Sequence, residues 1–402
     1  MSGTLPFVRG FEFSAVAAGI KKSGALDMGL IHCEASATSA AVFTQNLVRA
    51  APVVVSEVRA KKGRCRAVLA NSGNANACTG EDGVRDVETL TAAVARGIGD
   101  EPAGVLMAST GVIGERLPVD VMMRAVPELL LRRRADGAGD FARSIMTTDK
   151  FEKVAVAEGR VGRQDVRIVG CAKGAGMIAP NMATMLGFVW TDADVDNLFL
   201  REATAAATDA TFNRIVVDGD TSTNDMVVVL ASGRANGHGG SPLRESGRGG
   251  GAAFEELLRR VMMPLAKAIV KDGEGATHVV EIRVEGAASD KDARLIARRI
   301  AESPLVKTAF HGCDPNWGRL LAAAGRAGVP VRPDGMAIKV GGVAIVKRGV
   351  GLGKERESEA KAIMRGAEYV VEVDVGVGKG RAEVVTCDFS EEYVRINGSY
   401  RS

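Results

Sequence analysis

The segment with the most chemical content is CAKGAGMIAPNMATMLGF at 171–188, in which a threonine stands directly before an apolar run. Gly174, Gly176 and Pro180 precede that threonine, and such residues favour tight turns with unusual backbone angles. A hydroxyl held against the preceding peptide carbonyl can attack it, and hydrolysis of the resulting ester cuts the chain. Ala183 and Thr184 are therefore a candidate self-cleavage site, although β-propensity alone also places threonine at strand starts.

Cleavage at this point would make Thr184 an N-terminal residue that carries both a nucleophile and a base. An α-amine has a pKa of about 7.7–8.0, close to the pH at which general-base catalysis is most effective. A threonine paired with its own amine needs neither histidine nor metal.

The remaining candidates for metal or thiol chemistry are scattered. No pair of cysteines has C-x-x-C spacing, and the four histidines are far apart in the sequence. These residues are Cys33, Cys65, Cys78, Cys171, Cys313, Cys387, His32, His238, His278 and His311. We therefore predict no metal site and no disulfide framework.

Composition and charge argue against a nucleic-acid-binding protein and against a membrane protein. The 402 residues include 52 Lys and Arg against 49 Asp and Glu, a net charge of +3 that gives no basis for a nucleic-acid partner. No apolar stretch reaches about 20 residues, and the N-terminus lacks the pattern of a signal peptide. We expect a cytoplasmic protein without a membrane segment, large enough for two domains or one layered domain with an appendage.

The elements that must position these residues alternate between short β-rich runs and helical periodicity, which predicts a layered α/β protein. Strands are expected at 65–70, 104–108, 152–157, 165–170, 185–190, 214–218, 226–231, 277–285 and 381–387. Helices are expected at 84–98, 118–134, 194–210, 252–271, 289–303, 315–327 and 355–367. More regular alternation after about residue 281 suggests a smaller C-terminal α/β subdomain from about 282 to 402.

Eight segments, in the same order, resemble the ornithine acetyltransferase family, the self-cleaving glutamate N-acetyltransferases of arginine biosynthesis. The cleavage segment KGAGMIAPNMATML is one of them. The others are AGIKKSGALDMGLI, AAVFTQNLVRAAPV, LANSGNANACTG, STGVIGERLP, VDGDTSTNDM, FHGCDPNWGR and CDFSEEYVRINGSYRS. Together they cover nearly the whole chain.

The resemblance implies a role for particular residues. Thr184 corresponds to the family's nucleophile, Ala183 to the residue before the cut, and Thr110 with Gly111 to the oxyanion hole. The implied substrate contacts are Thr147, Lys173, Thr184, Glu274, Asn397 and Ser402. Lys173 suits a carboxylate and Glu274 an ammonium group, whereas without the resemblance both would be interpreted as solvated surface charges.

The resemblance also implies the reaction. A layered α/β sandwich of the self-processing ornithine acetyltransferase/aminopeptidase type would be cut into an α chain, 1–183, and a β chain, 184–402, which assemble as a heterotetramer of two α and two β chains. The enzyme would move an acetyl group from N2-acetyl-L-ornithine to L-glutamate by a ping-pong mechanism through acetyl-Thr184. No cofactor is implied, and acetyl-CoA remains open as a second acetyl donor, which would make the enzyme bifunctional.

One departure and two ambiguous motifs accompany the resemblance. Lys150 stands where the family commonly has threonine, and we expect it near the site. DGDTST at 218–223 is interpreted as a hydrogen-bonded turn near the site rather than a metal site. In FHGCDPNWGR, the neighbouring His311 and Cys313 are interpreted as part of a packed turn before a helix.

Three other functions remain open on the sequence. An N-terminal-nucleophile aminopeptidase or amidase of the same broad fold would pass the acyl group to water. A nucleotide-dependent enzyme is disfavoured because the glycine runs at 349–353 and 376–380 lack the phosphate-loop pattern. A non-catalytic interaction protein would remain uncleaved.

Overall fold

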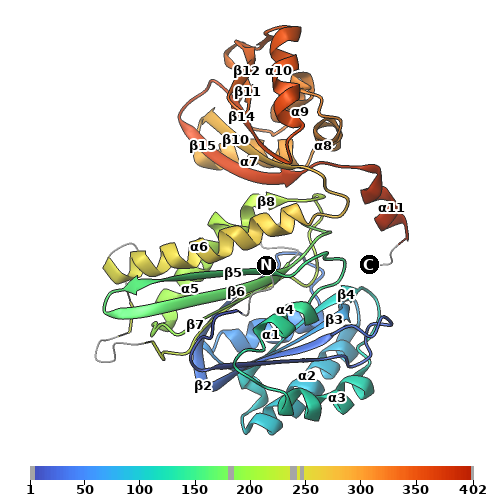
Figure 1. Cartoon of the computed structure of the whole chain (residues 1–402), viewed down its shortest axis with the longest axis vertical. Helices are drawn as coiled ribbons and strands as arrows, with labels where there is room; N and C mark the ends of the chain where they lie inside the picture. Colours follow the sequence, from blue (N-terminus) through green and yellow to red (C-terminus); the bar gives the residue numbers. More distant parts are fainter. Residues whose placement is uncertain (1–4, 180–184, 236–241, 245–248, 400–402) are drawn as a thin grey trace.

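The computed structural model of the chain describes residues 5–179, 185–235, 242–244 and 249–399. Two β-sheets organise these residues, each with helices packed on it (Figure 1). The first sheet belongs to the N-terminal two thirds of the chain. The second forms a smaller unit at the other end of the molecule, and the last helix, α11 (Glu391–Ser399), leads back from it toward the first sheet (Figure 1).

The first sheet has the strand order β4-β3-β2-β9-β7-β6-β5, with β1 also paired to β2. Its strands are β1 (Phe11–Val16), β2 (Met28–Phe43), β3 (Arg64–Asn74), β4 (Val105–Val112), β5 (Lys153–Val161), β6 (Gln164–Lys173), β7 (Leu186–Thr191) and β9 (Met226–Ala231). The pairs β3·β4 and β7·β9 are parallel, and the other pairs are antiparallel.

The long strand β2 divides this sheet into two halves. Its first part pairs with β1 and β3, its second part pairs with β9, and the pairing with β3 shifts register between His32 and Ala37. Side chains of β3 and β4, such as Val68, share one buried apolar cluster with Phe188 and Trp190 of β7. The two halves therefore face each other across this cluster, as the two layers of a β-sandwich do.

Helices cover the outer face of each half. The helices α1 (Ala51–Ala60), α2 (Gly80–Ile98) and α3 (Val119–Leu131) pack on the β3–β4 half, whereas α5 (Asn197–Ala210) and α6 (Gly249–Lys271) pack on the other half. Alternation along β9 makes this possible, because Val227 and Val229 face α5 and α6 while Val228 faces the inner cluster. The predicted layered α/β sandwich is confirmed.

The second sheet has the order β13-β12-β11-β14-β10-β15-β8. Its strands are β8 (Ile215–Val216), β10 (Val279–Ala287), β11 (Ala337–Val340), β12 (Val343–Lys347), β13 (Val350–Gly351), β14 (Glu368–Asp374) and β15 (Gly380–Cys387). One apolar cluster joins it to α7 (Asp290–Ala301), α8 (Pro304–His311), α9 (Trp317–Gly325) and α10 (Lys354–Met364). The subdomain start predicted near residue 282 lies inside β10.

Smaller elements complete the chain. The helix α4 (Ala138–Ser144) contacts β1 and contributes Phe141 to the inner cluster. The described residues also form the short 3-10 helices η1 (Pro102–Gly104), η2 (Phe212–Arg214) and η3 (Pro333–Gly335). The strand expected at 214–218 is reduced to the two residues of β8. Over the described ranges, no helix is long and apolar enough to cross a membrane.

Candidate active site

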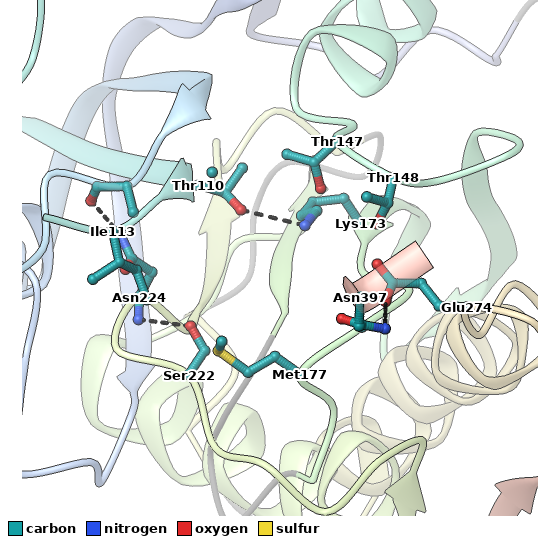
Figure 2. Close-up of a pocket in the computed structure, with 13 residues that line it drawn as sticks. Thr110, Ile113, Thr147, Thr148, Lys173, Met177, Ser222, Asn224, Glu274 and Asn397 are labelled. Atoms are coloured by element: carbon teal, nitrogen blue, oxygen red, sulfur yellow. Dashed lines mark hydrogen bonds between the residues drawn. The ribbon is translucent and has the colours of Figure 1, made fainter. Parts of the chain in front are cut away.

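A pocket opens where the ends of β4 and β6 meet the C-terminal end of α6 and the helix α11 (Figure 2). Every predicted site residue that the structure describes lines it. These residues are Thr110, Gly111, Thr147, Lys173, Glu274 and Asn397. Ala183, Thr184 and Ser402 lie outside the described residues. The structure thus brings together six residues from five segments of the chain, and their individual roles stay predictions.

The end of β4 supplies Thr110 and Gly111. Gly111 has φ +133°, and an added Cβ would lie 2.3 Å from the carbonyl carbon of Gly73 on β3. Only glycine fits this close approach of two strands. The Thr110 hydroxyl accepts a hydrogen bond of 3.3 Å from Lys173 Nζ (Figure 2), so its own proton can be donated elsewhere.

Lys173 is the last residue of β6 and only 8% exposed. Burial lowers the pKa of Lys173, while the nearby carboxylates of Asp149, Asp225 and Glu274 act in the opposite direction. In the antiparallel pairing of β6 with β7, Lys173 lies opposite Leu186. The chain therefore enters β7 beside the lysine that lines the pocket.

Glu274 follows the end of α6 and is 7% exposed. Its backbone N–H donates to the carbonyl of Ala175 at 2.8 Å, and its Oε2 accepts 2.8 Å from Nδ2 of Asn397 on α11 (Figure 2). Gly176 passes so close that a Cβ there would lie 2.5 Å from Glu274 Oε2. The interpretation of Lys173 and Glu274 as solvated surface charges is therefore wrong, because both are buried in the pocket wall.

A buried ion triad lies behind this wall. Lys153 Nζ donates to Asp149 Oδ1 at 2.6 Å and to Asp272 Oδ2, and all three side chains have no exposed surface. Asp149 also accepts the backbone N–H groups of Thr147, at 3.0 Å, and Gly174, at 2.7 Å. One carboxylate thus fixes the backbone beside two predicted substrate contacts.

The charge of Asp149 is stabilised by these partners. Burial raises its pKa, but the ammonium groups of Lys173 and Lys153 and the hydrogen bond from Gly174 outweigh burial and hold the pKa at about 2. Asp149 is consequently ionised at neutral pH. The other carboxylate of the triad, Asp272, accepts the backbone N–H of Lys150 at 3.2 and 3.0 Å, so it ties the segment after Thr147 to the segment that carries Glu274.

The described residues just before the predicted cut are held by the DGDTST turn. Asp218 accepts hydrogen bonds from the backbone N–H groups of Met177 and Ile178, the latter at 2.8 Å. The carbonyl of Ala179 accepts 3.3 Å from Thr221 Oγ1 and 3.1 Å from Arg298. The interpretation of this motif as a hydrogen-bonded turn near the site is confirmed.

Some pocket residues were not predicted from the sequence. Thr148 is adjacent to the predicted Thr147, Met177 lies in the KGAGMIAPNMATML segment, and Ser222 and Asn224 come from the DGDTSTND segment. Asn224 links β4 to the residue that follows β3, because its Nδ2 donates to the carbonyls of Ser109 on β4 and of Ala75. The sequence did contain a signal for Ser222 and Asn224, because their motif is one of the eight segments that resemble the family.

Two further predictions concern Lys150 and metal. The side chain of Lys150 is exposed and does not line the pocket, although its backbone is bound to Asp272. Among the described residues, no group of three histidine, cysteine or acidic side chains is arranged to hold a metal ion. That the reaction needs no metal stays a prediction.

Comparison with known proteins assigns the chain to a family. The ArgJ family model matches residues 12–402. The chain belongs to the ArgJ family. It is 48% identical to the arginine biosynthesis bifunctional protein ArgJ of Geobacter sulfurreducens, over 98% of this chain and 100% of that protein, and 48% identical to the protein of the same name from Syntrophotalea carbinolica, over 98% and 99%.

A solved structure of a protein named ArgJ is also similar to this chain. The crystal structure of the arginine biosynthesis bifunctional protein ArgJ from Bacillus halodurans is 42% identical and superimposes with a TM-score of 0.51, covering 54% of this chain and 100% of that chain. Family membership confirms the predicted enzyme of arginine biosynthesis, and the chain's relatives are named bifunctional, a point that the sequence left open.

Lys153→Met tests the structural importance of the triad. It should lower the free energy of unfolding by about 3–5 kcal/mol, because loss of the cation leaves two carboxylates buried without their partner. Lys267→Met is the matched control, since Lys267 forms a half-exposed pair with Glu281 at 3.3 Å, and such pairs contribute about 1 kcal/mol or less. Urea unfolding compares the two variants, and equal losses would contradict a stabilising role for the triad.

Proposed function

We propose that this ArgJ family member transfers an acetyl group from N-acetylornithine to glutamate, with Thr184 as the nucleophile. The observation that carries the proposal is the charge of the pocket. Of the described residues that line it, only Lys173 and Glu274 are charged, and both are buried. One cation and one carboxylate in one pocket suit an amino acid, whose carboxylate and ammonium groups each need a partner.

The position of Thr184 in the sequence supports its role. Met185 and Leu186 follow it directly, and Leu186 is paired with Lys173 at the pocket edge. The described residues on the other side, up to Ala179, are fixed by Asp218 and its turn. Fixed chain segments on both sides of the cut favour attack of the threonine hydroxyl on the preceding carbonyl. When folding already holds the reacting groups in place, less entropy is lost on reaching the transition state.

The sheet topology supports a protein that stays assembled after a cut between Ala183 and Thr184. Strands β7 and β9, which follow the cut, lie between β2 and β6, which precede it. The predicted β chain, 184–402, has 219 of the 402 residues. That share is close to the 54% of this chain covered by the whole solved chain of the Bacillus halodurans relative.

Thr110 and Gly111 are proposed to stabilise the oxyanion of the tetrahedral intermediate. The Thr110 hydroxyl accepts from Lys173, which leaves its proton available for a developing negative charge. An oxyanion-hole donor contributes about 2.7–4 kcal/mol to transition-state stabilisation. Because an amide is hard to break, this contribution should account for a large part of the rate.

The catalytic cycle then has two halves. The Thr184 hydroxyl, activated by its own α-amine, attacks the acetyl carbonyl and releases ornithine; glutamate enters the same pocket and takes the acetyl group from the acyl-threonine. No cofactor is required, and acetyl-CoA is the donor expected for the second activity of a bifunctional enzyme. Assembly as a heterotetramer and a cytoplasmic location stay predictions.

Substitution of Thr184 tests the nucleophile. Thr184→Ala should abolish both self-cleavage and acetyl transfer, because no side-chain oxygen remains. Thr184→Ser should retain both at lower rates, since the hydroxyl stays but the rotamer restriction of the branched side chain is lost. Thr89→Ala on the exposed face of α2 is the control. Gel analysis and an N-acetylornithine-to-glutamate assay provide the readouts, and normal turnover by Thr184→Ala would refute this assignment.

Two pocket substitutions separate binding from chemistry. Glu274→Gln should raise KM about ten- to a hundredfold with a small change in kcat, because a hydrogen bond to a charged group contributes about 1.5–3 kcal/mol. Thr110→Val should instead lower kcat by about 10²–10³, as for loss of an oxyanion donor. Steady-state kinetics with N-acetylornithine as the varied substrate measure both. The same pattern of effects in the two variants would contradict the proposed division of roles.

A further inference from the structure

A second group of reactive side chains lies in the C-terminal unit and does not line the pocket described above. Cys313, in the turn between α8 and α9, has its Sγ 3.8 Å from Nε2 of His278, which directly precedes β10. Thr277 Oγ1 is 2.8 Å from His278 Nδ1 and donates to Asp388 Oδ2 at 2.7 Å. As predicted from the sequence, Cys313 lies in a turn before a helix; the nearby His311 binds Asp388, at 2.8 Å. None of these residues lines the acetyl-transfer pocket.

These contacts determine which nitrogen of His278 carries the proton. The only hydroxyl proton of Thr277 is donated to Asp388, so Thr277 Oγ1 accepts from His278 Nδ1–H. The other ring nitrogen, Nε2, is then unprotonated and faces the thiol. Although burial raises the pKa of Asp388, hydrogen bonds from the Thr277 side chain, from two backbone N–H groups and from His311 hold it below its ordinary value, so the carboxylate that orients the group stays ionised.

The backbone of Cys313 is unusual for a residue with a side chain. Its φ is +48°, at the end of α8, a position where helices ordinarily have glycine. Helix capping alone therefore does not explain a cysteine there. The conformation is left-handed and strained for a cysteine. The half-buried thiol it presents has two acceptors in reach, His278 Nε2 and the carbonyl of Met364 at 3.3 Å.

A buried donor without a partner adjoins the same group. The hydroxyl of Tyr369 is buried and has no hydrogen-bond partner among the described residues. Its ring lies edge-on to His278, with centroids 6.1 Å apart, and burial raises its pKa, with Cys313 and Asp388 adding to the effect. A buried polar group without a partner is costly, so this hydroxyl is an unsatisfied donor next to the His278 ring.

We propose that Cys313 is a reactive thiol that exchanges with small disulfides, with His278 as its base. The Cys313 sulfur attacks one sulfur of RS–SR, a new S–S bond forms, and the old one breaks with its electron pair on the leaving RS⁻. His278 Nε2 takes the thiol proton and gives it to RS⁻, so the products are the mixed disulfide at Cys313 and RSH. The reaction is balanced without a further oxidant, and it is independent of acetyl transfer.

Cys78 provides an internal comparison. It is the exposed one of the six cysteines, whereas Cys33, Cys65, Cys171 and Cys387 are buried. Exposure alone predicts that Cys78 reacts faster than Cys313, and a neighbouring base predicts the reverse. Full-length protein carrying Cys78→Ser isolates the thiol of Cys313, and full-length protein carrying Cys313→Ser isolates that of Cys78.

The experiment measures reaction of each protein with DTNB by absorbance and with glutathione disulfide by intact mass and peptide mapping. Cys313 should react at least about tenfold faster than Cys78, and His278→Gln in the Cys78→Ser background should slow it by about tenfold or more, since a positioned general base contributes about 10²–10⁴-fold. His311→Gln is the matched control, because His311 binds the same Asp388 but not the thiol, and it should change the rate much less.

Three results would overturn the proposal. They are slower reaction of Cys313 than of Cys78, an unchanged rate in His278→Gln, and equal slowing by His278→Gln and His311→Gln. If His278→Gln does not fold, the pH dependence of the Cys78→Ser protein decides. A lone thiol reacts more slowly as the pH falls because less thiolate is present, whereas a thiol with a neighbouring base should lose less rate per pH unit. A loss per pH unit as steep as that measured for Cys78 in the Cys313→Ser protein would refute the assisted thiol.

Discussion

The ion triad of Lys153 with Asp149 and Asp272 is the constraint on which the site depends. Its three charges have no exposed surface, and buried charges are tolerated only when they are paired in a fixed geometry. The triad joins three segments far apart in sequence, which carry Thr147, Lys173 and Glu274. The distances between these pocket groups are therefore set by one buried network rather than by three separate loops.

The sandwich determines where this network can form. Because β2 pairs with β3 in its first part and with β9 in its second, the end of β4 with Thr110 and the end of β6 with Lys173 open into the same pocket. The second sheet contributes by returning α11, whose Asn397 binds Glu274. Both halves of the first sheet and the helix α11 thus line one small polar pocket. The opposite charges of Lys173 and Glu274 make this pocket complementary to an amino acid.

The sequence predicted most of the architecture and a defined part of the site. Strong periodicity located β9 at 226–231 and α6 near 252–271, but not β2, whose HCEASATSAA segment is rich in alanine and serine and has no clear alternation of apolar residues. The pocket residues were predicted through the family resemblance, since charge and spacing alone left Lys173 and Glu274 as surface residues. The ion pair of Lys153 with Asp272 could not be predicted from the sequence, because the two residues are 119 positions apart in the chain.

The central claim, an acetyl group carried by Thr184, is tested most directly by intact-mass analysis after incubation with N-acetylornithine alone. The account predicts one acetyl group on the fragment that begins at Thr184, located on that threonine by peptide mapping and removed on addition of glutamate with formation of N-acetylglutamate. Water should remove it slowly, because a transferase must shield its ester. No trapped acetyl group together with intersecting kinetic lines would show direct transfer in a ternary complex and contradict the account, and rapid hydrolysis without glutamate would indicate an amidase.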